Sequence, residues 1–419
     1  MASTKKERWP IKITYFFLSL VGFGVADTKN KRQLLNIALH TSLPLSLVSC
    51  WFAGSNFYLT ITGDGELSDK IDAAFLVLVV FLANSKLYMI AIKRQPYEHL
   101  LEVTDKTLWI QSWTDYGKDV LDECERQAIV VLFVFVILGH ASGAGWVIAP
   151  LVLNIKGNSS DPDDRHLPVK PILGPISPFD SPYFELIFAL DVFGSWVVTL
   201  LYFCFDYYLV LVNIFVVGQF GILKQRFEDI YTVGSFSLVT EFRLNDDKYA
   251  EKYKSMDYIL REFKDCVKQH QFLIAIVEEV EGVHKLMNLM QVLVFSLIIC
   301  IVGYQLLMSG SAVTLVKNGV FISSCLIQLF AMTLSCHNIM IASSDISQGI
   351  YSSGWYLENH THVGRSLSKD FMMVLMKTKY PCYLTGCGFF PITLDTLKSV
   401  NIGLSLLYEH RLSQLLFRT

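Results

Sequence analysis

Long apolar stretches without a formal charge constrain this chain more than any other feature of its sequence. The segments 286–308 and 318–344 contain no Asp, Glu, Lys or Arg, and each exceeds the roughly 20 residues that a helix needs to cross a bilayer. In the whole chain only 17% of the residues are charged, against about 25% in soluble domains. Because lipid offers no partners for backbone polar groups, such segments are predicted to be membrane-spanning helices.

Seven segments of this kind follow one another, and we therefore predict an all-α integral membrane bundle of seven helices. The fourth is too long for one straight crossing and should continue as a helix beyond the membrane. The seventh is the weakest, because it contains Asp395 and Lys398. We expect residues 1–419 to form a single domain, with cytoplasmic helical regions at 224–285 and 345–385. The predicted spans are 36–59, 73–92, 127–153, 186–223, 286–308, 318–344 and 386–408.

The connections between these segments differ strongly in positive charge. Lys and Arg number 26 in one alternating set of segments, 1–35, 93–126, 224–285 and 345–385, and 7 in the other, 60–72, 154–185, 309–317 and 410–419. Positive residues stay predominantly on the cytoplasmic side of a membrane. The N-terminus is therefore predicted to lie inside and, after seven crossings, the C-terminus outside.

The predicted outside connection 154–185 has two further features. It contains the sequon Asn158-Ser159-Ser160, so Asn158 is a predicted glycosylation site, whereas a second sequon at Asn359 falls inside and should be silent. The connection is also rich in proline, which excludes a long helix. We expect it to lie over the outer mouth of the bundle.

The inside segment 224–285 is the longest stretch predicted to lie outside the membrane. In its second half, apolar residues recur with helical periodicity and the pattern runs without a breaker into the fifth span. This pattern predicts one long helix, whose apolar stripe needs a partner.

Motifs of catalysis and cofactor binding are absent from the sequence. It contains no phosphate-binding loop, no GxSxG elbow and no HExxH. The nine cysteines show no CxxC spacing, so we expect no metal site. A net charge of −3 lacks the basic excess of nucleic-acid-binding proteins. The chain is therefore not expected to be an enzyme, to hold a cofactor or to bind nucleic acid.

Three ionisable residues within the predicted spans are costly in lipid and need an explanation. Asp191 is expected to reach the membrane interface near the outer end of its span, and Asp206 to lie at the inner interface. His140 either bonds to a neighbouring helix or contributes a polar contact to a ligand pocket. These residues include no paired acids that form a proton relay, so an ion-coupled transporter is not favoured.

The last 75 residues carry a series of short motifs. One is a Tyr-x-x-x-Trp segment after the sixth span, within Gln348-Gly349-Ile350-Tyr351-Ser352-Ser353-Gly354-Trp355-Tyr356. The others lie before and within the seventh predicted span: Lys379-Tyr380-Pro381, Leu384-Thr385-Gly386, Phe389-Phe390-Pro391, Leu394-Asp395 and Ser399-Val400. These motifs resemble the segment after the sixth helix, and the stretch before and within the final helix, of insect odorant receptors. The chain length and the inverted topology predicted above also match this family.

This resemblance implies a ligand-gated, non-selective cation channel in the plasma membrane of sensory neuron dendrites. Four subunits surround one pore and are embedded in membrane lipid, usually as a tuning subunit combined with a shared co-receptor. Cytoplasmic portions of the late helices form an anchor between subunits, and the final helix lines the pore. A small volatile ligand enters a pocket in the outer half of each subunit.

Helix direction then predicts the residues of that pocket, which come from the outer halves of the second to sixth spans. Trp146 is the best single candidate, because Gly143 and Gly145 should leave room beside its ring. Such a set forms an apolar cavity with few polar groups, suited to a small, mostly apolar volatile. Ordinary helix packing is the alternative role for each of these side chains. The set is Phe75, Val79, His140, Ser142, Trp146, Phe193, Trp196, Thr199, Tyr304, Phe321, Ser324 and Gln328.

The predicted final helix contains the polar residues Asp395, Lys398, Asn401 and Ser405, whose three- and four-residue spacings place them on one helical face. Either Asp395 and Lys398 form a local ion pair at the membrane boundary, or this polar face borders a cation path. The predicted pore residues are Asn401, Ser405, Tyr408 and Glu409. Glu409 and His410 depart from the family's usual apolar stretch, so we expect the chain alone to conduct poorly and to require its co-receptor. The alternative functions are a polytopic transporter and a metabotropic seven-helix receptor.

Overall fold

The structure is a computed structural model of the chain, and almost all of its described residues are helical. These residues are 8–63, 67–110, 112, 114–156, 165–172, 177–241, 248–308, 312–358 and 362–399. Among them, the isolated bridge between Thr385 and Pro391 is the sole β-pairing. The predicted all-α fold class is therefore confirmed.

Six long helices are apolar enough to cross a membrane, and they coincide with the first six predicted spans. They are α2 (Lys29–Thr62), α3 (Leu67–Ile92), α5 (Asp115–Lys156), α6 (Tyr183–Glu241), α7 (Lys248–Met308) and α8 (Ala312–Ser352). The shorter helices are α1 (Trp9–Val21), α4 (Arg94–Val103), the π-helical turn η1 (Thr104–Leu108), the 3-10 turn η3 (Trp355–Glu358) and α9 (His362–Thr378).

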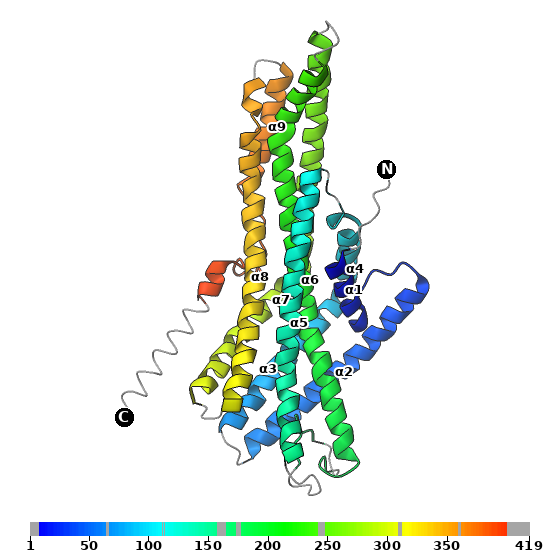
Figure 1. Ribbon diagram of the computed structural model, residues 1–419, viewed down its shortest axis with the longest axis vertical. Helices are drawn as coiled ribbons and strands as arrows, with labels where there is room; N and C mark the ends of the chain where they lie inside the picture. Colours follow the sequence, from blue (N-terminus) through cyan, green and yellow to red (C-terminus); the bar gives the residue numbers. More distant parts are fainter. Residues whose placement is uncertain are drawn as a thin grey trace, which may run out of the picture.

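Helix α6 forms the centre of the bundle. In its most apolar window 89% of the residues are buried, against 17% for the corresponding window of α5. The α6 residues from Leu200 to Val212 are all buried, and they are almost all apolar or aromatic. A helix that is apolar all round is expected in such a position, and Figure 1 shows α5, α7 and α8 beside it.

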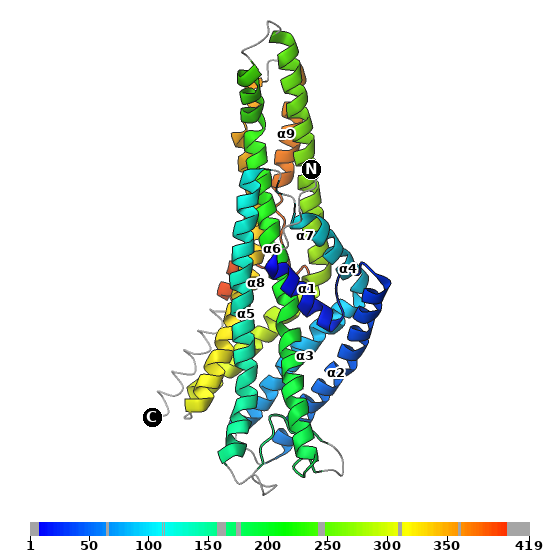
Figure 2. The same cartoon turned by 45° about the vertical axis from the view of Figure 1, so that its right-hand side comes forward.

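Helices α6 and α7 extend far beyond one membrane thickness. They have 59 and 61 residues, which at 1.5 Å per residue is about 90 Å, roughly three times the apolar core of a bilayer. The upper half of Figures 1 and 2 is built from their extensions, with α8 and α9 beside them. Helix α7 is continuous through this region, as the periodicity of its sequence predicts.

The apolar stripe of α7 finds its partner within the same chain. Phe263 of α7 contacts Phe371 of α9, with ring centroids 4.4 Å apart, and Phe227 of α6 at 6.3 Å. Arg226 of α6 bonds to Glu262 and Gln269 of α7. The first contact holds α9 against α7, and the others join the extensions of α6 and α7.

The predicted seventh span begins later than the sequence indicates. Helical geometry starts at 394, not at 386. Before it, the chain makes a tight turn in which the Gly386 N–H donates to the Phe390 carbonyl at 2.9 Å and Cys387 adopts a φ of 56°. Pro391 cannot donate a helical hydrogen bond, and its ring restrains the preceding residue. Residues 400–408 of this span lie outside the described residues.

Candidate ligand cavity

A cavity of about 140 Å³ lies at the end of the bundle where α5 ends and α6 begins. Its walls come from α2, α3, α5, α6 and α8, together with the connecting segment 165–172. A cavity of about 150 Å³ lined by apolar side chains is known to accept benzene. The space therefore fits a ligand about the size of one aromatic ring.

Three aromatic side chains from three helices form one wall of this cavity. The ring of Phe75 (α3) lies 4.5 Å from that of Phe321 (α8) in an edge-to-face arrangement, and 5.3 Å from that of Trp146 (α5). Such edge-to-face pairs are favourable beyond the area they bury. The Lys317 ammonium lies 4.4 Å from the Trp146 ring and forms a 2.5 Å ion pair with Asp72. This cation–π contact and ion pair join α3, α5 and α8 at the cavity wall.

The segment 165–172 closes one side of the cavity, where Pro168 and Val169 line it. Side chains of three helices bond to its backbone. Asn154 of α5 accepts from the His166 N–H and donates to the His166 carbonyl, each at 2.7 Å. Asn56 of α2 accepts from the Lys170 N–H at 3.2 Å, and Asp191 of α6 accepts from the Val169 N–H at 3.1 Å.

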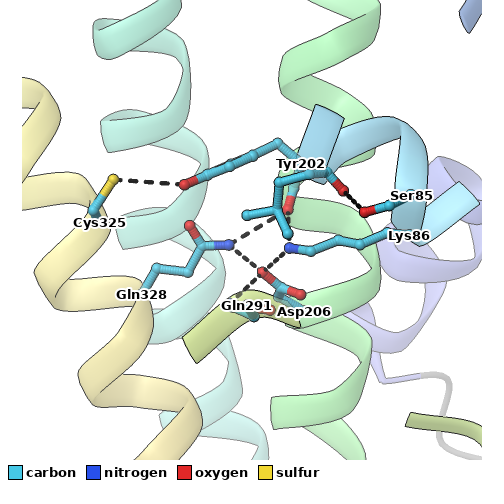
Figure 3. A network of polar contacts seen from close by, with 8 residues as sticks. Ser85, Lys86, Tyr202, Asp206, Gln291, Cys325 and Gln328 are labelled. Atoms are coloured by element: carbon cyan, nitrogen blue, oxygen red, sulfur yellow. Dashed lines mark hydrogen bonds and ion pairs between the residues drawn. The ribbon is translucent and has the colours of Figure 1, made fainter. Parts of the chain in front are cut away.

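A buried polar network centred on Lys86 and Asp206 lies next to the cavity, on the side of the extension (Figure 3). The Lys86 ammonium is 2.6 Å from Asp206 Oδ2, and each of these side chains is only 1% exposed. Lys86 also donates to the carbonyl of Tyr202, a residue that lines the cavity. Gln291 and Gln328 both donate to Asp206 Oδ2. The network thus joins α3, α6, α7 and α8 next to the cavity.

The structure brings part of the predicted ligand-binding set together. The residues from this set that line the cavity are Phe75, Val79, Ser142, Trp146, Thr199 and Phe321. Ser324 and Gln328 line a smaller neighbouring space, which shares the lining residues Gly139 and Tyr202 with the cavity. The others are not among the residues that line either space: His140, Phe193, Trp196 and Tyr304.

The side chains outside the cavity have other contacts. His140 Nδ1 lies 2.9 Å from the Val136 carbonyl of its own helix, and its ring packs edge-to-face on Phe203. Phe193 and Trp196 are exposed at the surface of the bundle, with their rings 6.3 Å apart. The predicted pore residues Asn401, Ser405, Tyr408 and Glu409, and the predicted glycosylation site Asn158, lie outside the described residues.

The glycines beside Trp146 have close neighbours in the structure. A Cβ on Gly143 would come within 2.8 Å of the Thr199 hydroxyl, so this glycine allows α5 and α6 to approach each other. A Cβ on Gly145 would meet the Lys317 side chain at 3.6 Å. Gly143 also lines the cavity together with Trp146.

Sequence reasoning missed the roles of the buried charges. Asp191 is only 6% exposed and lines the cavity. Asp206 is likewise in the core, paired with Lys86. One signal was available: a Lys and an Asp in neighbouring apolar spans tolerate burial best when they pair with each other.

The comparisons with known proteins agree with this architecture. The family model described as 7tm Odorant receptor matches residues 66–401. Odorant receptor Or2 of Anopheles gambiae is 20% identical over 342 residues, which cover 81% of this chain and 84% of that protein. Odorant receptor 10 of Aedes albopictus is 19% identical over 338 residues, covering 80% and 82%.

Solved structures share the same fold. The insect olfactory receptor OR5 from Machilis hrabei superposes with a TM-score of 0.76 at 16% identity, covering 97% of each chain. The same receptor in complex with eugenol gives a TM-score of 0.75, also at 16% identity, with 96% of this chain and 97% of the other covered. With a family model that matches most of its length, this multi-pass membrane protein belongs to the insect odorant receptor family.

Proposed function

We propose that the chain is the tuning subunit of an odorant-gated, non-selective cation channel in the plasma membrane, and that the cavity described above is its ligand site. The observation that carries this proposal is the apolar cavity walled by Phe75, Trp146 and Phe321. Small-molecule sites are typically concave and apolar, with few polar groups. A relative solved in complex with eugenol supports a small volatile ligand.

The size and lining of the cavity define the ligand expected. Its volume corresponds to about one ring, and burial contributes about 25 cal/mol per Å² of apolar surface. Shape and burial therefore supply most of the affinity for a small, mostly apolar volatile. The segment 165–172, which we place on the outer side, separates this ligand from water.

The co-receptor is proposed as the partner in a heterotetramer. The extension beyond the membrane supports this, because α9 presents the exposed apolar side chains of Met372, Met373 and Met376. An exposed apolar patch of this kind is typical of a protein–protein contact. In this arrangement the final helix borders the cation path with Asn401, Ser405, Tyr408 and Glu409. Glu409→Gln should alter permeability or conductance and leave ligand preference intact.

The test of the ligand site is Trp146→Ala in cells that co-express the co-receptor. Removal of the ring deletes a wall of the cavity, so the agonist concentration for half-maximal current should rise at least about tenfold, equivalent to about 1.4 kcal/mol. Trp196→Ala is the matched control, because Trp196 belongs to the same end of the bundle and is exposed at its surface. An unchanged concentration dependence in Trp146→Ala, at normal surface expression, would refute this site.

A metabotropic receptor is the competing function within the same fold. In that case the response would disappear when G proteins are blocked, and excised patches would show no ligand-evoked current. A transporter would instead show paired half-helices and an ion site at mid-membrane. Within the described residues, the six long helices are continuous and no group of three or more His, Cys, Asp or Glu is placed to hold a metal ion.

A further inference from the structure

Asp191 is a buried acidic group in the wall of an otherwise apolar cavity. Its side chain is 6% exposed and lies on α6 at the side closed by the segment 165–172. Oδ2 accepts a hydrogen bond from the Val169 N–H at 3.1 Å. Within the described part of the chain, Oδ1 has no hydrogen-bond partner and the carboxyl group has no ion-pair partner.

The space beside this carboxyl group is open. Gly194 lies one helical turn from Asp191 and also lines the cavity. A Cβ built on Gly194 would meet no atom within 4 Å. A ligand in the cavity can therefore approach Asp191 from the side of Gly194.

The other polar side chains around the cavity are already engaged as donors. The hydroxyls of Ser142, Ser195 and Thr199 each donate to a carbonyl of their own helix. Asp191 thus presents a free acceptor oxygen in surroundings that penalise an unpaired polar group. A ligand that donates a hydrogen bond relieves this penalty, whereas one that does not leaves the carboxyl group unpaired.

We infer that Asp191 makes the cavity selective for ligands that carry a hydrogen-bond donor, a hydroxyl or an amine, on an apolar body about the size of one ring. This inference rests on the proposed function of the cavity as the ligand site. Under this inference, two parts of the site have different roles. The aromatic wall contacts the apolar body of the ligand, and Asp191 accepts a hydrogen bond from its polar end.

Four probes of equal heavy-atom count test this selectivity: phenethyl alcohol, phenethylamine, propylbenzene and phenylacetaldehyde. Binding is measured on the purified full-length receptor, with the affinity of each probe taken from the dependence of thermal stabilisation on probe concentration. We expect the alcohol, the amine or both to bind at least about tenfold more tightly than propylbenzene and phenylacetaldehyde, which lack a donor. Comparison of the alcohol with the amine shows whether the site prefers a neutral donor or a cation. Equal affinities for all four probes would overturn the inference.

Asp191→Asn provides the second arm. The amide oxygen keeps the bond from the Val169 N–H, and the amide NH₂ then takes the position of the free acceptor. Affinity for the donor probes should fall at least about tenfold, and phenylacetaldehyde should bind equally well or better. Asp180→Asn is the control, since Asp180 is exposed and belongs to the same end of the bundle.

Trp146→Ala separates the two proposals. If it weakens all four probes while Asp191→Asn changes none, the cavity remains the ligand site and the selectivity inference is wrong. If no probe stabilises the wild-type receptor, or if Trp146→Ala changes none of the affinities, the cavity itself is not the site. Should Asp191→Asn fail to fold, the comparison of the four probes on the wild-type receptor decides the inference alone.

Discussion

At the scale of single residues, the ion pair between Lys86 and Asp206 is the centre of a polar network that joins four helices next to the cavity. Both side chains are 1% exposed, and Gln291 and Gln328 complete the contacts of Asp206. A buried pair is costly to form, yet the loss of one partner alone is worse, because an uncompensated charge stays in the core. The pair therefore makes this helix arrangement strongly dependent on both residues.

We expect Asp206→Asn to destabilise the receptor by about 3–5 kcal/mol, because it leaves the Lys86 ammonium buried without a counter-ion. The double change Lys86→Met with Asp206→Asn should recover part of this loss. Thermal unfolding of the purified receptor and surface expression measure the effect. The control is Asp265→Asn, which breaks the exposed pair with Lys268. Equal effects of the two single substitutions would contradict this role.

The sequence predicts the positions of individual residues in the fold only in part. Phe75, Trp146 and Phe321 are large, and each lies in the half of an apolar span that was expected to contain the site, so their position in the cavity follows from helix direction. Burial of Lys86 against Asp206 depends on contacts between residues 120 positions apart. Rotation of a helix about its own axis decides whether Phe193 or Val198 faces inward, and packing sets that rotation.

At the scale of elements, the segment 165–172 lines the cavity, and we propose that it controls access to it. Its two hydrogen bonds with Asn154 and those with Asn56 and Asp191 tie it to three helices. The proline content predicted an irregular segment over the site, but not the side chains that hold it. Since each bond contributes about 1 kcal/mol, the closed position is stable but can be opened by thermal motion.

Asn154→Ala removes two of these bonds and should make opening easier by about 2 kcal/mol. Ligand should then dissociate at least several-fold faster, which is measured as the decay of current after agonist washout. Lys170→Ala serves as the control, because its exposed side chain is deleted while its backbone bond to Asn56 remains. Similar washout rates for both variants and the wild type would argue against this segment as the closing element.

The turn before the final helix is the second element with a specific role. The N–H and the hydroxyl of Thr385 both donate to the Glu281 carboxylate of α7, and the Cys387 N–H donates to the Lys285 carbonyl. The turn residues resemble those of the family, but the sequence predicted helix from 386 onward. These bonds explain the difference, because they satisfy the backbone without a helix.

Thr385→Val removes the hydroxyl bond to Glu281 while it keeps the backbone bond. Under the proposed function, the final helix then loses a fixed starting point beside α7, so maximal current should fall several-fold at unchanged ligand affinity. Thr396→Val is the comparison variant. It removes a hydroxyl bond to the Pro391 carbonyl, which lies in the turn region and does not involve α7. A loss of ligand affinity in Thr385→Val would contradict the separation of the two functions.

At the scale of the whole molecule, the orientation in the membrane is predicted from the charge of the connections. The predicted orientation has 154–185 outside and 345–385 inside. Asn158→Gln should therefore abolish a glycosidase-sensitive shift in electrophoretic mobility, and Asn359→Gln should leave it unchanged. Glycan on Asn359 would reverse the orientation and contradict the placement of the ligand cavity on the outer side.

The fold as a whole was predictable because six apolar windows coincide with six long helices. The extension beyond the membrane was predictable as well, from the unbroken periodicity of α7. The proposed heteromer could not be predicted in the same way, because its contacts also depend on the surface of the partner chain. The exposed methionines of α9, Met372, Met373 and Met376, form the surface that we propose to contact a partner subunit.

Ligand-evoked current in excised patches tests the central claim most directly, because it requires both a ligand site and a pore and excludes soluble second messengers. Patches from cells that express this chain with its co-receptor should show agonist-gated, non-selective cation current. Trp146→Ala should shift its concentration dependence at least about tenfold, and the chain alone should give little or no current. Absence of current in patches from responsive cells would contradict the claim that this receptor is part of a ligand-gated channel.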